Sequence, residues 1–150
     1  MKQFAYEAPE YQLSRKPGEN HLRGAQIKSA KDGAAYLRQL YGDDIDIYES
    51  AFMIMLNRAN NVIGNYKLSQ GGINGTVIDP RMVCKAAVDT LCSAVMICHN
   101  HPSGNLQPSR ADEELTQKIK NALVFMDIKL IDHIVLTNES FYSFADEGML

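Results

Sequence analysis

A short apolar run that ends in two histidines constrains the fold of this chain more than any other stretch. Residues 93–98 (Ser-Ala-Val-Met-Ile-Cys) are rich enough in branched side chains to predict a strand buried on both faces. His99 and His101 follow at its end. Because side chains alternate along a strand, both imidazoles point the same way, in phase with Val95 and Ile97. The sequence therefore predicts two adjacent imidazoles where a buried strand ends.

The segment after the histidines predicts a loop and then a helix. Pro102 and Gly104 end the strand, and Pro108 with Ser109 begins the helix. Its expected apolar positions are Leu115, Ile119, Ala122, Leu123 and Met126. Asp112 falls in the first turn of this helix, a loop's width from the imidazoles. Two histidines and an aspartate are a suitable ligand set for a catalytic zinc ion that keeps its fourth position for water.

Each of these residues also has a purely structural interpretation. His99 and His101 can be polar core groups satisfied by hydrogen bonds, and Ser109 with Asp112 is close to a capping box at the positive end of the helix dipole. Taken singly, the structural interpretation of each residue is favoured. Taken together, the pattern favours a metal site.

The joint pattern resembles the JAMM signature, also called JAB or MPN+, of a metalloprotease superfamily. The string His-x-His-Pro-x-Gly is followed by Ser-x-x-Asp, with seven residues between the second His and the Ser. The signature also includes a glutamate on an upstream strand, to which Glu49 corresponds. The chain is most similar to the RadC-type proteins, from Glu49 through residues 99–104 to Asp132-His133 and residues 142–144, which is about two-thirds of its length.

This resemblance implies both a fold and a mechanism. The fold is α/β, with a mixed central sheet covered by helices in the three-layer JAB/MPN architecture, which is cytidine-deaminase-like. His99, His101 and Asp112 would bind Zn²⁺, Glu49 would be the general base, and the Ser109 hydroxyl would stabilise the developing oxyanion. The implied reaction is hydrolysis of a peptide or isopeptide bond in an extended peptide or protein-conjugate substrate.

The sequence also allows three other functions, namely an interaction module, a DNA-repair protein and a nucleobase deaminase. MPN-type relatives that have lost ligands act as interaction modules, whereas this chain keeps every ligand-type residue. RadC-type proteins are traditionally associated with DNA repair and recombination and commonly carry an N-terminal helix-hairpin-helix region; we expect a short form without it. A nucleobase deaminase expects His-x-Glu and Pro-Cys-x-x-Cys, and neither motif occurs in the sequence.

The composition of the chain limits which kinds of partner it can bind and in which cellular compartment we expect it. A net charge of −3 and a pI near 5.8 argue against an extended DNA-binding surface, which is usually basic. Neither a signal-peptide pattern nor an apolar run long enough to cross a membrane occurs, so we expect a cytoplasmic protein without membrane association. The oligomeric state stays open, and a homo-oligomer is one alternative.

The three cysteines predict reduced thiols. Cys84, Cys92 and Cys98 are an odd number and lack the spacing of a metal knuckle, as in many cytosolic proteins. Cys98 adjoins His99, which suggests a catalytic Cys-His pair. Alternation along the strand, however, points the two side chains to opposite faces, so Cys98 is interpreted as a core residue.

The remaining chain divides into an extended lead-in over residues 1–27, containing one edge strand at most, and a RadC-like domain over residues 28–150. One helix is expected from Ser29 to about Gly42. A second is expected after Asp79, with a buried face made of Val83, Ala86, Ala87 and Leu91. Strands are expected over residues 47–57, 62–68, 128–137 and 141–144. Asp43, Asp44 and Asp46 are interpreted as a solvated turn, and the loop containing Gly71, Gly72 and Gly75 as a connector.

Two further residues keep alternative interpretations. Glu49 leads into an apolar strand, where a buried charge without a partner costs several kcal/mol, unless it lies at an exposed strand end. The resemblance favours the catalytic role. His133 either orients a metal ligand from behind or is a structural histidine. The structural role is favoured, and His133 is left out of the ligand set.

Overall fold

The computed structural model describes residue 9 and residues 24–72 and 76–150. The described part of the chain forms a sheet of five strands in the order β2-β1-β3-β4-β5. The strands are β1 (Ser50–Leu56), β2 (Val62–Gln70), β3 (Ala94–Asn100), β4 (Lys129–Leu136) and β5 (Phe141–Ser143). β3 and β4 run parallel, while the other neighbouring pairs are antiparallel. The sheet is therefore mixed, as expected.

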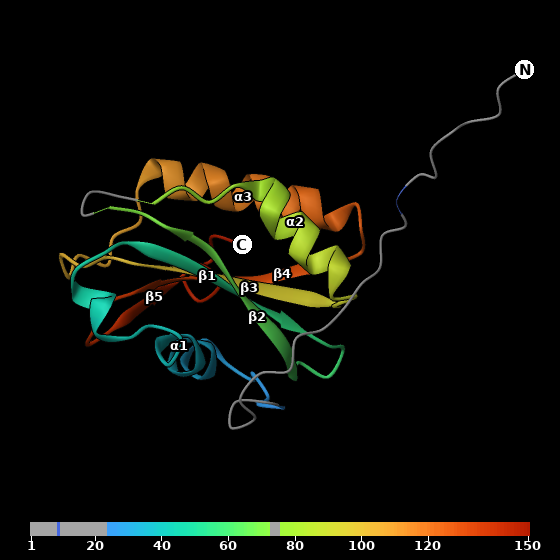
Figure 1. Cartoon of the computed structure of the whole chain (residues 1–150), viewed down its shortest axis with the longest axis horizontal. Coiled ribbons are helices and arrows are strands. Elements are labelled where there is room, and N and C mark those ends of the chain that lie inside the picture. The colour runs from blue at the N-terminus through green and yellow to red at the C-terminus, as the bar shows by residue number, and fades with distance from the viewer. Residues whose placement is uncertain (1–8, 10–23, 73–75) are drawn as a thin grey trace, which may run out of the picture.

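Three helices cover the two faces of this sheet and make three layers. Helix α1 (Ala30–Arg38) lies on one face, and α2 (Pro80–Asp89) and α3 (Arg110–Val124) lie on the other (Figure 1). This arrangement confirms the predicted α/β class and agrees with the JAB/MPN architecture. Among the described residues, no helix is long and apolar enough to cross a membrane.

The central strands supply both halves of the core. Every residue of β1 and β3 is buried. Alternate side chains of these strands pack under α1, namely Phe52, Ile54, Leu56, Ala94, Met96 and Cys98. The intervening side chains pack under α2 and α3, namely Ala51, Met53, Met55, Val95 and Ile97. His99 is in phase with this second set, so the helices α2 and α3 share a face of the sheet with it.

The predicted helix starts are confirmed, because each one depends on a short-range contact. The side chain of Ser29 accepts a hydrogen bond from the Asp32 backbone N–H at 3.2 Å, and Asp79 accepts one from the Arg81 N–H at 2.9 Å. Pro80 occupies the first helical position of α2. Helix α1 ends at Arg38, earlier than the predicted end at Gly42.

Two predicted helix positions are wrong, because Leu91, expected on the buried face of its helix, and Met126, expected among the apolar positions of the next, both lie outside a helix and are exposed. Leu91 is 79% exposed and has a φ of 54°, and Met126 is 36% exposed. Both residues lie beyond the helix ends, because α2 ends at Asp89 and α3 at Val124. A residue that follows the last helical turn no longer obeys the helical spacing on which the predictions rested.

The strand that follows Glu49 begins later than predicted. β1 starts at Ser50, and a 3₁₀ helix, η2 (Asp43–Asp46), precedes it. All three aspartates of η2 are exposed, in agreement with their interpretation as a solvated turn. Glu49 therefore lies just before the strand and not within it.

Some of the sequence-based predictions concern residues outside the described ones. Residues 1–8 and 10–23 of the lead-in and residues 73–75 of the glycine loop belong to this group. At the end of the lead-in, Gln26 forms an antiparallel bridge with Asn61, and the Ile27 N–H donates to the Asn60 carbonyl at 2.9 Å.

Candidate metal centre

The two histidines lie together at the end of the central strand, as predicted. His99 is the penultimate residue of β3, where it pairs with Ala51 of β1 and Val135 of β4. Its side chain is 2% exposed, and that of His101 is 17% exposed. The two Nε2 atoms are 3.0 Å apart. The end of β3 and the first residue after it thus bring two imidazole nitrogens together, one buried and one partly exposed.

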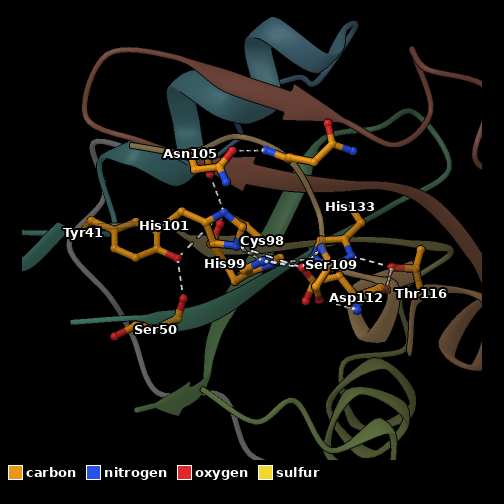
Figure 2. A network of polar contacts seen from close by, with 11 residues as sticks. Tyr41, Ser50, Cys98, His99, His101, Asn105, Ser109, Asp112, Thr116 and His133 are labelled. Atoms are coloured by element: carbon orange, nitrogen blue, oxygen red, sulfur yellow. Dashed lines mark hydrogen bonds and ion pairs between the residues drawn. The ribbon is translucent and has the colours of Figure 1, made fainter. Parts of the chain in front are cut away.

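Asp112 reaches this pair from the first turn of α3. Its Oδ2 lies 3.4 Å from His99 Nε2 and 4.0 Å from His101 Nε2 (Figure 2). The capping box is present as well: Ser109 Oγ accepts from the Asp112 N–H at 3.0 Å, and Asp112 Oδ2 accepts from the Ser109 N–H at 2.8 Å. The structural and ligand interpretations of Asp112 are therefore compatible, because the cap fixes the carboxylate where it faces the imidazoles.

The environment of Asp112 favours its ionised form. Burial acts to raise the pKa of this carboxyl, but His99, when its ring is protonated, and the hydrogen bonds with Ser109 outweigh it and hold the pKa well below its usual range. A negative carboxylate is the form that a metal cation requires.

Glu49 approaches the histidines from the segment just before β1, the strand next to β3. One carboxylate oxygen of Glu49 and one ring nitrogen of each of His99 and His101 all lie within 4.8 Å of one another. The backbone of Glu49 is fixed by the start of the glycine loop, because its carbonyl accepts from the Gly71 N–H at 2.8 Å. Its side chain is partly buried. Glu49 is therefore close enough to serve either as a ligand or as a base one water away.

The spacing of these groups fits a small divalent cation. With metal–nitrogen bonds near 2.0–2.1 Å, two ligand atoms on one tetrahedral ion lie about 3.3 Å apart. The separations of 3.0, 3.4 and 4.0 Å among His99, His101 and Asp112 bracket that value. Two imidazoles and a carboxylate are also a donor set typical of zinc. These residues could hold a metal ion without a large rearrangement.

His133 contacts His99 directly, and Thr116 lies behind it. His99 Nδ1 is 2.8 Å from His133 Nε2, and His133 Nδ1 is 2.6 Å from Thr116 Oγ1. Thr116 belongs to no motif in the sequence. The available signal was a polar residue on the buried face of α3, four residues after Asp112 and three before Ile119.

Asn100, which lies between the two histidines, is a second site residue without a predicted role. Its side chain is fully buried on the α1 face of the sheet and makes three hydrogen bonds. Its Oδ1 accepts from the Ser50 N–H at 2.7 Å, and its Nδ2 donates to the carbonyls of Ile45 and Tyr48 at 2.7 and 2.8 Å. Two of these partners flank Glu49, so Asn100 fixes the backbone on both sides of that carboxylate.

Cys98 lies on the opposite face from the histidines, as predicted. Its Sγ is 3.7 Å from the Tyr41 hydroxyl under α1. Burial raises the pKa of the Cys98 thiol to about 12, so this thiol stays protonated. A catalytic Cys98-His99 pair is therefore excluded by geometry and by charge state.

Comparison with known proteins points to one family. The model of the RadC-like JAB domain matches residues 27–149. A UPF0758 protein of Flavobacterium johnsoniae is 39% identical over 135 residues, which cover 90% of this chain and 58% of that protein. A UPF0758 protein of Chlorobium chlorochromatii is 37% identical over 131 residues, which cover 87% of this chain and 57% of that protein.

The match to a third relative covers a larger share of that relative's length than the first two matches do. A UPF0758 protein of Shewanella baltica is 32% identical over 162 residues, which cover 95% of this chain and 72% of that protein. This chain spans less than two-thirds of the length of the Flavobacterium and Chlorobium relatives. The family match extends from just before α1 to the penultimate residue and includes every residue of the candidate metal centre. The chain therefore belongs to the RadC-like JAB domain family.

Proposed function

We propose that this chain is a zinc-dependent hydrolase that cleaves peptide or isopeptide bonds in extended peptides or protein conjugates. The observation that carries the proposal is the convergence of two imidazoles and two carboxylates at the end of β3. Those groups come from β3, the loop after it, the first turn of α3 and the segment before β1. Membership of the JAB domain family supports the same class of reaction.

His99, His101 and Asp112 are the residues that would hold the zinc ion. Both histidines offer Nε2, and Asp112 offers a carboxylate that its capping box has already oriented. A bound zinc ion supplies Lewis acidity, which lowers the pKa of a water ligand towards ~7 and polarises a substrate carbonyl. The Asp112 carboxylate brings a negative charge close to the two ring nitrogens, and that charge favours a divalent cation.

Glu49 is proposed as the general base. Its carboxylate lies within 4.8 Å of both ring nitrogens, which is a distance that a single water can bridge. Glu49 would accept the proton of the attacking water and deliver it to the leaving amine. Because its backbone is fixed by Gly71 and by the segment that Asn100 holds, the carboxylate needs no large movement to do so.

Ser109 is proposed to stabilise the oxyanion. Its Oγ accepts a hydrogen bond from the Asp112 N–H, and its own hydroxyl hydrogen remains available as a donor. Since Ser109 is exposed beside a proposed ligand, a substrate carbonyl oxygen can approach it. Charge that develops on that oxygen during attack would then be stabilised by a fixed donor.

The test is a panel of peptide and isopeptide-linked substrates incubated with the zinc-loaded protein, with and without a chelator. We expect cleavage that stops on chelation and returns with added zinc. Glu49→Gln should keep zinc and lose turnover, whereas Glu139→Gln, which changes an exposed glutamate, should behave like the wild type. Turnover by Glu49→Gln would remove Glu49 from the mechanism. Stoichiometric zinc without cleavage of any substrate would favour an interaction module.

A further inference from the structure

A buried chain of hydrogen bonds runs from the candidate metal centre to the backbone of α3. His99 Nδ1 contacts His133 Nε2 at 2.8 Å, His133 Nδ1 contacts Thr116 Oγ1 at 2.6 Å, and Thr116 Oγ1 donates to the Asp112 carbonyl at 2.6 Å (Figure 2). His133 and Thr116 are fully buried, and His99 is nearly so. Bulk water therefore does not compete for these groups.

The Asp112 carbonyl, at the end of this series of hydrogen bonds, fixes the direction of every hydrogen bond in the series. The Asp112 carbonyl can only accept, so the single hydroxyl hydrogen of Thr116 points to it. Thr116 Oγ1 must then accept from His133 Nδ1–H. A neutral imidazole carries one N–H, so His133 Nε2 is bare and accepts from His99 Nδ1–H.

These hydrogen-bond directions determine the state of His99 Nε2, the atom that would bind the metal. With its hydrogen on Nδ1, neutral His99 presents a lone pair at Nε2, which faces His101 and Asp112. His101 reaches the same state independently, because its Nδ1 lies 2.5 Å from the Asn105 carbonyl, which can only accept. Two bare nitrogens 3.0 Å apart repel each other unless a cation or a proton lies between them.

We propose that His133 is a positioning residue which, together with Thr116, sets the tautomer of His99 and so prepares its Nε2 for metal. This inference rests on the proposed metal site but not on the nature of the substrate. Of the two roles that the sequence left open for His133, orienting a metal ligand or a purely structural one, this proposal assigns the first. The same contacts also tie β3, β4 and the first turn of α3 to one another, so the His99 ring and the turn that carries Asp112 are held as one unit.

His133 is itself held in one orientation and one charge state. Its ring stacks on Phe144 with centroids 4.7 Å apart and an interplanar angle of 9°. The His133 ring is fully buried, and among the described residues its ring nitrogens contact only His99 and Thr116 and no carboxylate. An unpaired charge is costly in such a position, so the neutral ring that the hydrogen-bond directions require is the favoured form.

The first test reads the tautomer of His133 directly from the ¹⁵N chemical shifts of its ring. In the metal-free wild type we expect a protonated Nδ1 and a bare Nε2. Thr116→Val removes the acceptor for Nδ1–H, so we expect His133 to shift towards the Nε2–H tautomer. Thr116→Ser should restore the wild-type spectrum. Thr90→Val is the matched control, because Thr90 makes the same hydroxyl-to-carbonyl bond to Ala86 away from the site.

The second test measures zinc affinity by competition with a chromophoric chelator. His133→Phe keeps a flat ring beside Phe144 but has no nitrogen, and we expect about 10- to 100-fold weaker zinc binding, as is typical when a partner of a metal-bound histidine is removed. Thr116→Val should weaken binding in the same direction. His133→Gln, whose amide offers both an acceptor and a donor, should recover part of the loss.

These results separate the inference from the proposed function. A wild-type His133 with its hydrogen on Nε2 would overturn the inference, as would Thr116→Val and His133→Phe variants that fold and bind zinc as tightly as the wild type. A wild type that binds no zinc would instead overturn the proposed function, and the spectrum of the metal-free protein would still decide the hydrogen-bond directions.

Discussion

The side chain of Asn100 provides a stability prediction that can be worked through from its three contacts. Asn100→Ala would remove the acceptor for the Ser50 N–H and the donor for the carbonyls of Ile45 and Tyr48. Ser50 and Ile45 are buried, whereas Tyr48 is 38% exposed. Water can therefore replace the lost partner of Tyr48 but not those of the other two.

The expected magnitude follows from this difference. A buried polar group that loses its partner costs about 1–3 kcal/mol, and an exposed one costs less than about 1 kcal/mol. Two buried groups and one accessible group, together with the small void left by the amide, give an expected loss of about 3–5 kcal/mol in the free energy of unfolding.

Urea denaturation of the metal-free protein, held in chelator, measures this loss without a contribution from metal binding. Asn138→Ala is the matched control, because Asn138 makes a single exposed hydrogen bond to Asp46 at 3.0 Å. We expect the control to change the free energy of unfolding by no more than about 0.5 kcal/mol. A loss below about 1 kcal/mol for Asn100→Ala would refute the assignment of Asn100 as the residue that fixes the segment around Glu49.

Two further predictions concern buried ionisable groups. Because burial raises the pKa of the Cys98 thiol to about 12, iodoacetamide should modify the partly exposed Cys84 well before Cys98 in the native protein; equal rates in peptide mapping by mass spectrometry would contradict this. Burial also raises the pKa of Asp132, although Ser143 donates to it, so folding favours its protonated form. Asp132 therefore makes its full contribution to the free energy of unfolding below the usual aspartate pKa of about 3.9. That contribution is lost as the pH rises through the higher pKa that Asp132 has in the folded protein. Relative to Asp132→Asn, the wild type should therefore lose unfolding free energy as the pH rises above about 4, and a constant difference in urea titrations would contradict the shift.

The features that the sequence predicted correctly are mostly local. The helix starts at Ser29, Asp79 and Ser109 depend on residues two or three positions away, so the pattern alone identifies them. The shared direction of His99 and His101 follows from strand alternation in the same way.

The features that the sequence did not predict depend on contacts between distant segments. Thr116 is 17 residues from His133, and His133 is 34 residues from His99, so their alignment exists only once β4 pairs with β3 and α3 packs over both. The partners of Asn100 lie 50 to 55 residues earlier in the chain. The prediction for Leu91 failed for a local reason. The helical spacing of apolar residues correctly predicted α2, but it did not show that α2 ends at Asp89, before Leu91.

Every proposed role above depends on a zinc site formed by His99, His101 and Asp112, and the zinc content of the purified protein shows whether that site exists. The protein would be isolated without chelator and analysed by elemental mass spectrometry together with Asp112→Ala and with Asp43→Ala, which changes an exposed aspartate of η2. We predict about one zinc ion per chain in the wild type and in Asp43→Ala, and a loss of zinc in Asp112→Ala. A wild-type protein that carries no zinc and takes up none when zinc is added would contradict the account.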